Sequence, residues 1–243
     1  MRIFIIRHGE SVGNLYKICL GHTDLGLTDR GREQAFATAK ALEHLHFYRI
    51  YSSDLCRAVE TAHPNAFLRG IADGDIVRLS SLRELYFGDW ENAAVDDLKS
   101  RYGDMFTIGW RQNFGTFTPP NGESVPDLAD RMCNALSDIA RECFFQITSE
   151  GSRLIDNNGS ASREDVFSST PDVNILVVSH AASIRAFWGK ISGYNPEDVC
   201  DAVPFPSNAS YSIVDYDVGR DVFTPVAYSV DGHLAELKTA LPG

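Results

Sequence analysis

The sequence lacks any hydrophobic run long enough to cross a membrane, which takes about 20 apolar residues. Its N-terminal apolar run, Ile3–Ile6, is also far shorter than the ~7–15 residues of a secretory signal. Five cysteines form no Cys-x-x-Cys pair and leave an odd thiol, so we expect neither a disulfide framework nor a zinc ribbon. These absences favour a cytoplasmic protein without a membrane partner.

Positive charge is scarce as well. The 22 lysines and arginines are outnumbered by 33 acidic residues, which gives a net charge of -11. A chain of this charge repels nucleic acids and anionic membranes on average, so neither is an expected partner. A small anion can still bind in a pocket where a few arginines reverse the local field.

Strand-like apolar runs alternate with helical patterns along the 243 residues, which suit a single domain. This alternation predicts an α/β sandwich around a largely parallel sheet. The first and fourth apolar runs are continuous, as in strands that are covered on both faces. The expected strands are Ile3–Ile6, Ile50–Tyr51 with its neighbours, Ile76–Leu79, Ile175–Val178, Tyr211–Val214 and Val226–Val230.

Helical spacing of apolar residues predicts helices over 27–45, 52–68 and 124–145. Thr28 is a candidate N-cap of the first helix. Pro64 is expected to bend or divide the second helix, because proline removes a backbone donor and clashes with the preceding turn.

Two segments between these elements show no strand pattern. We expect residues 91–121 to form a helical lid over the edge of the sheet. The aromatic side chains of this segment suit either its own core or the wall of a site for an apolar substrate. The polar segment 148–172 is expected to be a mobile surface insertion.

Two of the expected strands end on a histidine. Ile3–Ile6 is followed by Arg7 and His8, and Ile175–Val178 by Ser179 and His180. Because ligands of open parallel sheets sit outside the carboxyl ends of the strands, we expect both histidines in one crevice. A helix that begins after the second histidine should direct its backbone N–H groups to the same place, which favours an anion.

Two further groups are expected near this edge. Arg57 stands near the start of a helix that follows a strand, and Glu84 lies between a strand and the Gly88 turn. Arginines hold phosphate oxygens, a neutral imidazole attacks phosphorus, and a carboxylic acid protonates the leaving oxygen, so the set suits phosphoryl transfer. Taken singly, each residue also has a structural explanation as a surface arginine, a helix cap or a core histidine. The other histidines show no metal-ligand spacing, so we expect no metal.

Six segments stand in order along the chain: RHGES, GHTDLGLTDRG, SSDLCRAVETA, LRELYFGDWE, NGES and VVSHAASIR. This ordered set, from Arg2 to about Gly193, resembles the histidine phosphatase superfamily, which includes cofactor-dependent phosphoglycerate mutases and fructose-2,6-bisphosphatases. The resemblance implies a three-layer α/β/α sandwich with a mainly parallel six-stranded sheet. It also implies that neither a metal nor another cofactor is needed.

The resemblance assigns roles to the strand-end residues. His8 is implied to be the nucleophile that becomes phosphohistidine. Arg7, Arg57 and His180 are implied to hold the transferring phosphoryl group, and Glu84 to act first as an acid and then as a base. Cationic neighbours should lower the pKa of His8 and keep its imidazole neutral.

Further positions match residues that touch phosphate or substrate in relatives. Asn14 and Gly21 match such positions, and Asn208 resembles a position that lines the pocket in some members. Arg111 corresponds to one of two neighbouring arginines that grip the carboxylate of a mutase substrate. Ala181 stands where glycine is commoner and is expected to alter the pocket wall.

Phosphatases and mutases of this family share their chemistry as far as the phosphoenzyme. Leu20 replaces a usual polar residue and Gln112 the second arginine, which both favour the phosphatase branch, as does FGDWE. Asn92 and Asn121 replace frequent glycines. We expect a metal-independent phosphomonoester hydrolase that acts on a small phosphorylated metabolite as a monomer or homodimer. The alternatives are a cofactor-dependent phosphoglycerate mutase and a non-catalytic protein that binds phosphorylated ligands.

Overall fold

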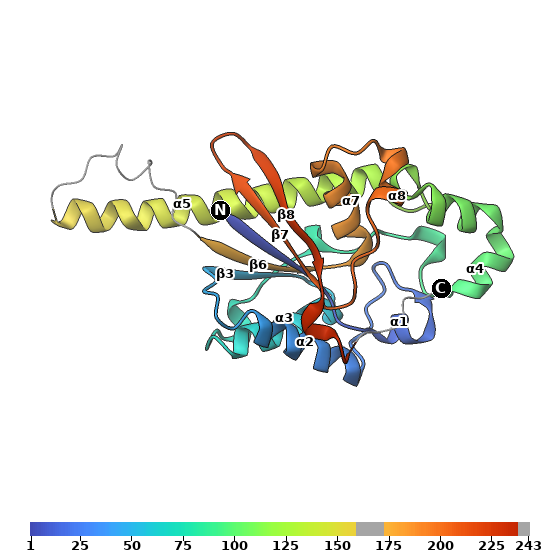
Figure 1. Cartoon of the computed structure of the whole chain (residues 1–243), viewed down its shortest axis with the longest axis horizontal. Coiled ribbons are helices and arrows are strands. Elements are labelled where there is room, and N and C mark those ends of the chain that lie inside the picture. Colours follow the sequence, from blue (N-terminus) through green and yellow to red (C-terminus); the bar gives the residue numbers. More distant parts are fainter. Residues whose placement is uncertain (159–172, 238–243) are drawn as a thin grey trace.

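A six-stranded sheet forms the centre of the computed structural model, which describes residues 1–158 and 173–237 (Figure 1). The strand order is β4-β3-β6-β1-β7-β8. The strands are β1 (Arg2–Arg7), β3 (Arg49–Ser53), β4 (Val77–Leu79), β6 (Asn174–Ser179), β7 (Tyr211–Asp217) and β8 (Val222–Val230). Neighbouring pairs are parallel from β4 to β1, whereas β7 is antiparallel to both β1 and β8. The expected mainly parallel six-stranded sheet is therefore confirmed.

Helices cover both faces of the sheet, which gives the expected three layers. Helices α2 (Asp29–Ala41) and α3 (Cys56–Phe67) lie on one face, and α5 (Val125–Asn158) and α7 (Ala181–Ile191) on the other. The described residues also form three shorter helices, α1 (Val12–Tyr16), α4 (Val95–Tyr102) and α8 (Val199–Ala202).

The central strand β1 is buried on both faces. Ile3 and Ile5 pack in the core beneath α5 and α7, whereas Phe4 and Ile6 pack in the core beneath α2 and α3. Successive side chains of a strand point to opposite faces, so a strand between two helical layers needs apolar residues at every position. This explains the continuous apolar run in the sequence.

Helix α2 begins as the sequence predicts, since the Thr28 side chain accepts a hydrogen bond from the Gly31 N–H. Of the two outcomes expected at Pro64, a bend or a division, the division does not occur: helix α3 continues past Pro64 to Phe67. The backbone N–H of Leu68 still donates to the Pro64 carbonyl at 3.1 Å. Burial of one face of α3 offsets the single hydrogen bond that the proline removes.

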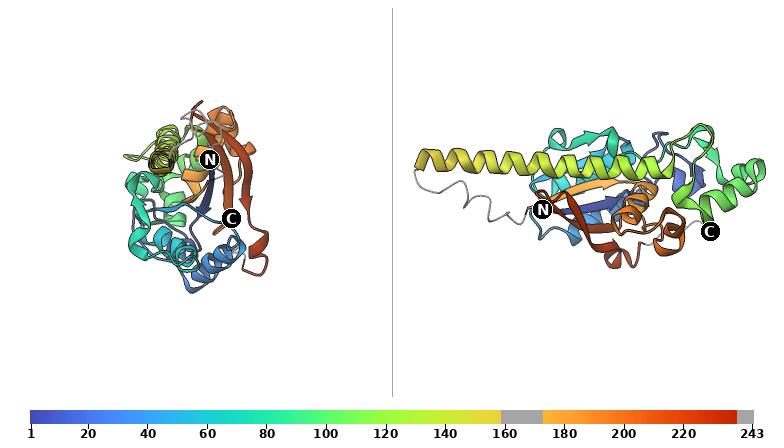
Figure 2. Two further views of the ribbon diagram at one scale, coloured as in Figure 1. Left: turned by 90° about the vertical axis from the view of Figure 1, so that its left-hand side faces the viewer. Right: turned by 90° about the horizontal axis from the view of Figure 1, so that it is seen from above.

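Helix α5 is longer than the sequence pattern predicts. It continues to Asn158, so residues 148–158 of the segment expected to be a mobile surface insertion are helical. Propagating an existing helix adds one hydrogen bond per residue, and one glycine costs only about 1 kcal/mol. Figure 2 shows α5 running past the end of the sheet. Residues 159–172 of the expected insertion lie outside the described residues.

The lid segment (residues 91–121) contains one strand that the sequence did not reveal. Residues Ala93–Ala94 form β5, which pairs antiparallel with β2 (Ile18–Cys19). Helix α4, a π-helical turn over Met105–Trp110 and a short 3-10 turn follow, so the rest is helical as expected. A two-residue strand without apolar alternation leaves no pattern, because its partner lies far away in the sequence.

No helix in the described part of the chain combines the length and the apolar character that crossing a bilayer would take.

Strand β8 begins earlier than predicted and includes Pro225. An edge strand tolerates a proline because one side of it has no partner to receive a hydrogen bond.

Candidate active site

The register of the sheet brings the two strand-end histidines together. Strands β1 and β6 are parallel neighbours, with Arg7 opposite Ser179, so His8 and His180 follow directly at the same carboxyl edge of the sheet. The His8 N–H donates to the Ser179 carbonyl at 3.0 Å, and the two imidazole centroids are 5.2 Å apart. The expected convergence of the histidines is observed.

Most of the expected site residues surround one inner cavity of about 170 Å³. The charged and titratable groups among them are at most 9% exposed, so the cavity is deep as well as small. The expected residues that line it are Arg7, His8, Asn14, Gly21, Arg57, Glu84 and Ala181. His180 lies beside His8 and is fully buried.

One ring nitrogen of His8 is fixed and the other is left for chemistry. The Nδ1 atom lies 2.7 Å from the Gly9 carbonyl, which is an acceptor only, so Nδ1 carries the proton and Nε2 keeps its lone pair. Burial, followed by the charges of Arg57 and Arg7, holds the pKa of His8 well below its ordinary value. The imidazole is therefore neutral near pH 7, as a nucleophile requires.

Backbone carbonyls hold the two arginines in place. The Arg57 guanidinium donates to the carbonyls of Gly21 at 2.7 Å and Thr23 at 2.9 Å. The Arg7 guanidinium donates to the Pro206 carbonyl at 2.5 Å. Burial lowers the pKa of Arg7 to about 10, which leaves it charged at neutral pH. Both cations are positioned by dipoles and not by carboxylates, so their charge remains available to an anion.

Some buried polar atoms at this edge have no partner among the described residues. These are the Arg7 Nε atom and both ring nitrogens of His180. Buried polar groups are almost always hydrogen-bonded, so each of these atoms is a candidate to contact a bound ligand or water. The charges of Arg57 and Arg7 act on His8 here, so a ligand at this edge meets positive surroundings.

The loop that contains Gly21 is fixed by Glu91, which the sequence pattern did not single out. The Glu91 carboxylate accepts from the N–H groups of His22 and Thr23, both at 2.9 Å. Gly21 has a φ of +48°, and a Cβ atom there would collide with the Glu91 carboxylate. Glu91 is thus a positioning residue, because it holds the carbonyls that orient Arg57.

The N-terminus of α7 receives an anion, but that anion belongs to the protein. The Glu84 carboxylate accepts from the N–H groups of Ala182 and Ser183, both at 3.1 Å, and from that of Leu85 at 2.9 Å. The expectation that these helix N–H groups serve the ligand is therefore wrong. They position the carboxylate that is expected to transfer the proton, and Ser183 Oγ adds a contact at 3.1 Å.

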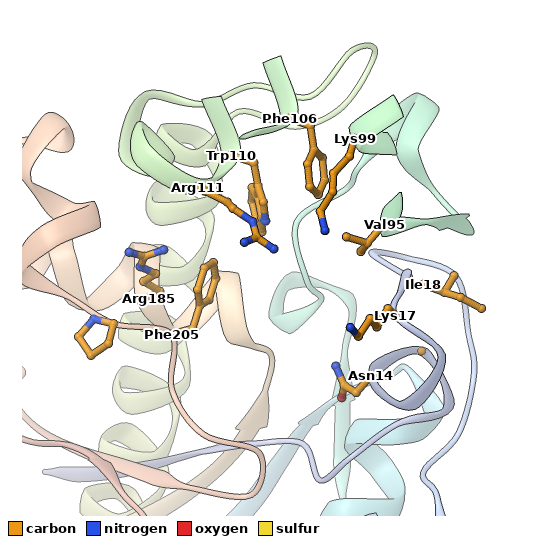
Figure 3. A pocket seen from close by; sticks show the side chains of 12 residues that line it. Asn14, Lys17, Ile18, Val95, Lys99, Phe106, Trp110, Arg111, Arg185 and Phe205 are labelled. Carbon is orange, nitrogen blue, oxygen red and sulfur yellow. The ribbon is translucent and has the colours of Figure 1, made fainter. Parts of the chain in front are cut away.

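Asn208 does not line the inner cavity but contacts two residues that do, His8 and Asn14. Its side-chain amide donates to the His8 carbonyl at 3.2 Å and to Asn14 Oδ1 at 3.1 Å. Because Asn14 Oδ1 is thereby occupied, the Asn14 amide nitrogen is left to face a ligand. Figure 3 shows this nitrogen directed toward a second, outer cavity, which Asn14 also lines.

Arg111 lies away from the inner cavity. It lines the larger outer cavity of about 430 Å³, which is drawn in Figure 3.

The backbone accommodates the three residues that replace glycines common in the family. Ala181 is the first residue of α7, and Asn92 and Asn121 have φ values of 58° and 56°, which asparagine tolerates best after glycine.

Within residues 1–158 and 173–237, no three His, Cys, Asp or Glu side chains gather as a metal site would require. The aromatic residues of the lid segment form mainly a core: Phe106 and Phe117, for example, contact the fully buried Trp90 at 5.2 and 5.1 Å between ring centroids. Phe106 and Trp110 also line both cavities.

The buried neutral histidines predict a pH-dependent stability. The pKa of His180 is also lowered, by burial and then by Arg57 and His8, whereas unfolded histidines titrate near 6.5. The unfolded chain therefore binds more protons than the folded chain below pH 6.5. As the pH decreases below 6.5, the free energy of unfolding decreases by up to ~1.4 kcal/mol per pH unit for each imidazole. Urea denaturation at pH 7.0 and 5.5 in phosphate-free buffer measures this slope. The double variant His8→Asn/His180→Asn should have a clearly smaller slope, and equal slopes would contradict the neutral pair.

Comparison with known proteins agrees with this geometry. Residues 3–146 match the histidine phosphatase superfamily, branch 1. A 2,3-bisphosphoglycerate-dependent phosphoglycerate mutase of Bartonella tribocorum is 33% identical over 199 residues, which cover 81% of this chain and 84% of the mutase. The adenosylcobalamin/alpha-ribazole phosphatase of Salmonella typhimurium is also 33% identical, over 54% of this chain and 63% of that enzyme. The alignment with the mutase of Bartonella henselae likewise spans only 64% of its length.

The fold has close counterparts among solved structures. The complex of a mycobacterial glucosyl-3-phosphoglycerate phosphatase with VO3 superimposes with a TM-score of 0.74, over 94% of this chain and 98% of that chain. The two sequences are 23% identical, so this likeness concerns the fold.

Proposed function

Since the chain belongs to the histidine phosphatase superfamily, we propose that it is a metal-independent phosphomonoester hydrolase that forms a phosphohistidine on His8. The observation that carries this proposal is the state of His8, whose Nδ1 is bound to the Gly9 carbonyl while the ring is held neutral between Arg7 and Arg57. A lone pair on Nε2 therefore faces a small cavity in which cations surround the attacked phosphorus.

The first step forms an N–P bond and breaks the P–O bond of the ester. His8 Nε2 attacks phosphorus while Arg7, Arg57 and His180 bind the three equatorial oxygens, over which the transition state spreads its charge. Glu84 gives its proton to the leaving oxygen. Glu84 Oε2 suits this role, since it accepts one backbone N–H, whereas Oε1 already accepts from Leu85 and Ser183.

The second step returns the enzyme to its starting state. Ionised Glu84 takes a proton from a water molecule as that water attacks phosphorus and the N–P bond breaks. Inorganic phosphate leaves, and both His8 and Glu84 regain the protonation states in which they began. The cycle consumes one ester and one water, and no metal or redox partner enters the balance.

Two features of the cavities favour hydrolysis over mutase chemistry. Leu20 is 7% exposed and lines the inner cavity with an apolar side chain, so it offers no hydrogen bond to a sugar-acid phosphate. Arg111 lines the outer cavity, but Gln112, which replaces the second arginine of mutases, does not, so a sugar-acid carboxylate would meet one arginine and not two. Mutase chemistry remains the second candidate, because the mutase of Bartonella tribocorum matches 81% of this chain at 33% identity, whereas the phosphatase of Salmonella typhimurium matches 54% at the same identity.

The test compares phosphate release with isomerisation. We expect the purified chain to release phosphate from 4-nitrophenyl phosphate at the same rate with and without EDTA. With 3-phosphoglycerate, phosphate release should exceed formation of 2-phosphoglycerate, whether or not 2,3-bisphosphoglycerate is present. Isomerisation faster than hydrolysis would assign the mutase activity instead. Binding of phosphate esters without turnover would support the non-catalytic alternative.

A further inference from the structure

The outer cavity is continuous with the catalytic cavity. Both are lined by the same five residues, Asn14, Ile18, Val95, Phe106 and Trp110, so together they form one cleft. The inner part, at about 170 Å³, suits the phosphoryl group and the atoms next to it. The outer part, at about 430 Å³, lies in the range of sites for much larger ligands. A three-carbon acid would leave most of this space unused.

One wall of the outer cavity is aromatic and rigid. The Trp110 ring packs edge to face against Phe87 at 5.0 Å and Phe114 at 5.2 Å between centroids. Phe106 beside it is only 3% exposed. Rings that are fixed in this way offer a ready apolar surface, which costs a ligand little ordering of the protein.

The rest of the outer cavity is positively charged. Lys17, Lys99, Arg111 and Arg185 line it, and Figure 3 shows Lys17, Lys99 and Arg111 reaching into the same space from different segments. No aspartate or glutamate of the described residues lines it. Such a gathering is notable in a chain with a net charge of -11, because like charges converge only at a cost that an anion can offset.

The four cations differ in how firmly the protein holds them. Arg185 donates to the carbonyls of Val203 at 2.6 Å and Cys200 at 2.8 Å and is 3% exposed, so its position is structural. Lys99 pairs only with Asp96, whose side chain is 83% exposed, and such a solvated pair contributes little. Among the described residues, the Lys17 ammonium has no ion-pair partner. The two lysines can therefore turn to a ligand without breaking a buried contact.

The backbone at Lys17 adds to this argument. Lys17 caps helix α1 with a φ of 53° and a ψ of 48°, the left-handed conformation that glycine or asparagine usually takes at a helix end. A lysine there is strained, and its main-chain carbonyl accepts the Val95 N–H at 2.9 Å. The strained residue lies where α1 meets the lid segment, directly at the cavity.

We propose that the outer cavity binds a second anionic group of the substrate, a carboxylate or a phosphate, at Lys17 and Lys99. An apolar spacer between this group and the reacting phosphate lies against Phe106 and Trp110. The substrate class is thus a phosphomonoester with a long leaving group that is apolar in the middle and anionic at the far end. This inference rests on the proposed function and specifies the leaving group.

The experiment uses matched esters that differ only in the distant charge. Phosphate esters of linear ω-hydroxy acids with three, six, nine and twelve carbons are compared with the corresponding primary amides, and kcat/KM is measured for each. One spacer length should favour the carboxylate over the amide by roughly tenfold, the size of a charge-assisted hydrogen bond. A third series that ends in phosphonate tells whether the site prefers a phosphate-like dianion.

Variants connect this preference to the two lysines. Lys17→Gln/Lys99→Gln should bring the carboxylate-to-amide ratio close to one. The control Lys40→Gln/Lys190→Gln removes the same charge from exposed ion pairs with Glu43 and Asp130 and should keep the wild-type ratio. Equal hydrolysis of acid and amide esters at every length would overturn this inference alone. No hydrolysis of any ester would overturn the proposed function and the inference with it.

Discussion

His8→Ala is expected to reduce phosphate release by on the order of 10⁴-fold or more, because alanine lacks the Nε2 atom that forms the bond to phosphorus. Two other side chains with nucleophilic atoms line the inner cavity, but burial raises the pKa of the Cys19 thiol and Ser11 Oγ donates to Asn14 Oδ1. The ring of His180 lies beside that of His8, but His180 is fully buried and does not line the inner cavity. Release of 4-nitrophenol measures the loss.

The matched control for this variant is His63→Ala, which changes a half-exposed histidine of α3 that pairs with Asp73. Circular dichroism and thermal denaturation should show that both variants are folded. Rapid quenching of the wild-type enzyme in alkali should trap an adduct that is stable to base and labile to acid, and His8→Ala should give none. Activity of the variant within tenfold of wild type, or an acid-stable adduct, would contradict the role of His8.

Glu84→Gln is expected to slow hydrolysis of alkyl phosphates about 10²–10⁴-fold, which is the usual effect of losing a general acid. Esters of 4-nitrophenol should slow far less in this step, because their leaving oxygen departs without a proton. The glutamine side chain has a single acceptor oxygen, so it can accept from only one of the Ala182 and Ser183 N–H groups, which now bind different oxygens of the Glu84 carboxylate. Burst kinetics separate the first step from phosphoenzyme hydrolysis, in which Glu84 acts as the base.

Ser183→Ala is the control that tests position without removing the carboxylate. It deletes the Oγ contact to Glu84 and leaves the backbone N–H groups of α7 in place. We expect a loss of less than about tenfold, and a larger one for alkyl than for aryl esters, because only the alkyl leaving group needs the proton from Glu84. If Glu84→Gln slowed both ester classes equally, Glu84 would not be the proton donor.

The centre of the fold follows from local sequence. The side chains of β1 and β6 face two cores, so unbroken apolar runs are enough to identify both strands. Two strands that end on histidine then predict the site, since parallel neighbours end at the same edge. Local pattern is sufficient here because the same residues form the strand and lead into the site.

Features that depend on distant partners escaped prediction. The pairing of β2 with β5 joins two dipeptides about 75 residues apart, with no periodicity in either. The contact of Glu84 with α7 was also missed, because a helix N-terminus attracts any anion and the sequence does not say which. Lys17 and Lys99 have the sequence surroundings of ordinary surface lysines, and only the tertiary structure places them at one cavity.

The β2–β5 ladder has a consequence for how this enzyme can diverge. The residues proposed to be catalytic follow strands of the sheet (His8 and His180) or contact helix α7 (Glu84). The lid segment meets the loop before Gly21 through two paired dipeptides and the Asn92 N–H, which donates to the Cys19 carbonyl at 2.7 Å. These contacts are made by the main chain, so apart from Glu91, whose carboxylate holds the Gly21 loop, they place little demand on side-chain identity. Selection can therefore rewrite the lid for a new metabolite while the reaction itself is inherited intact.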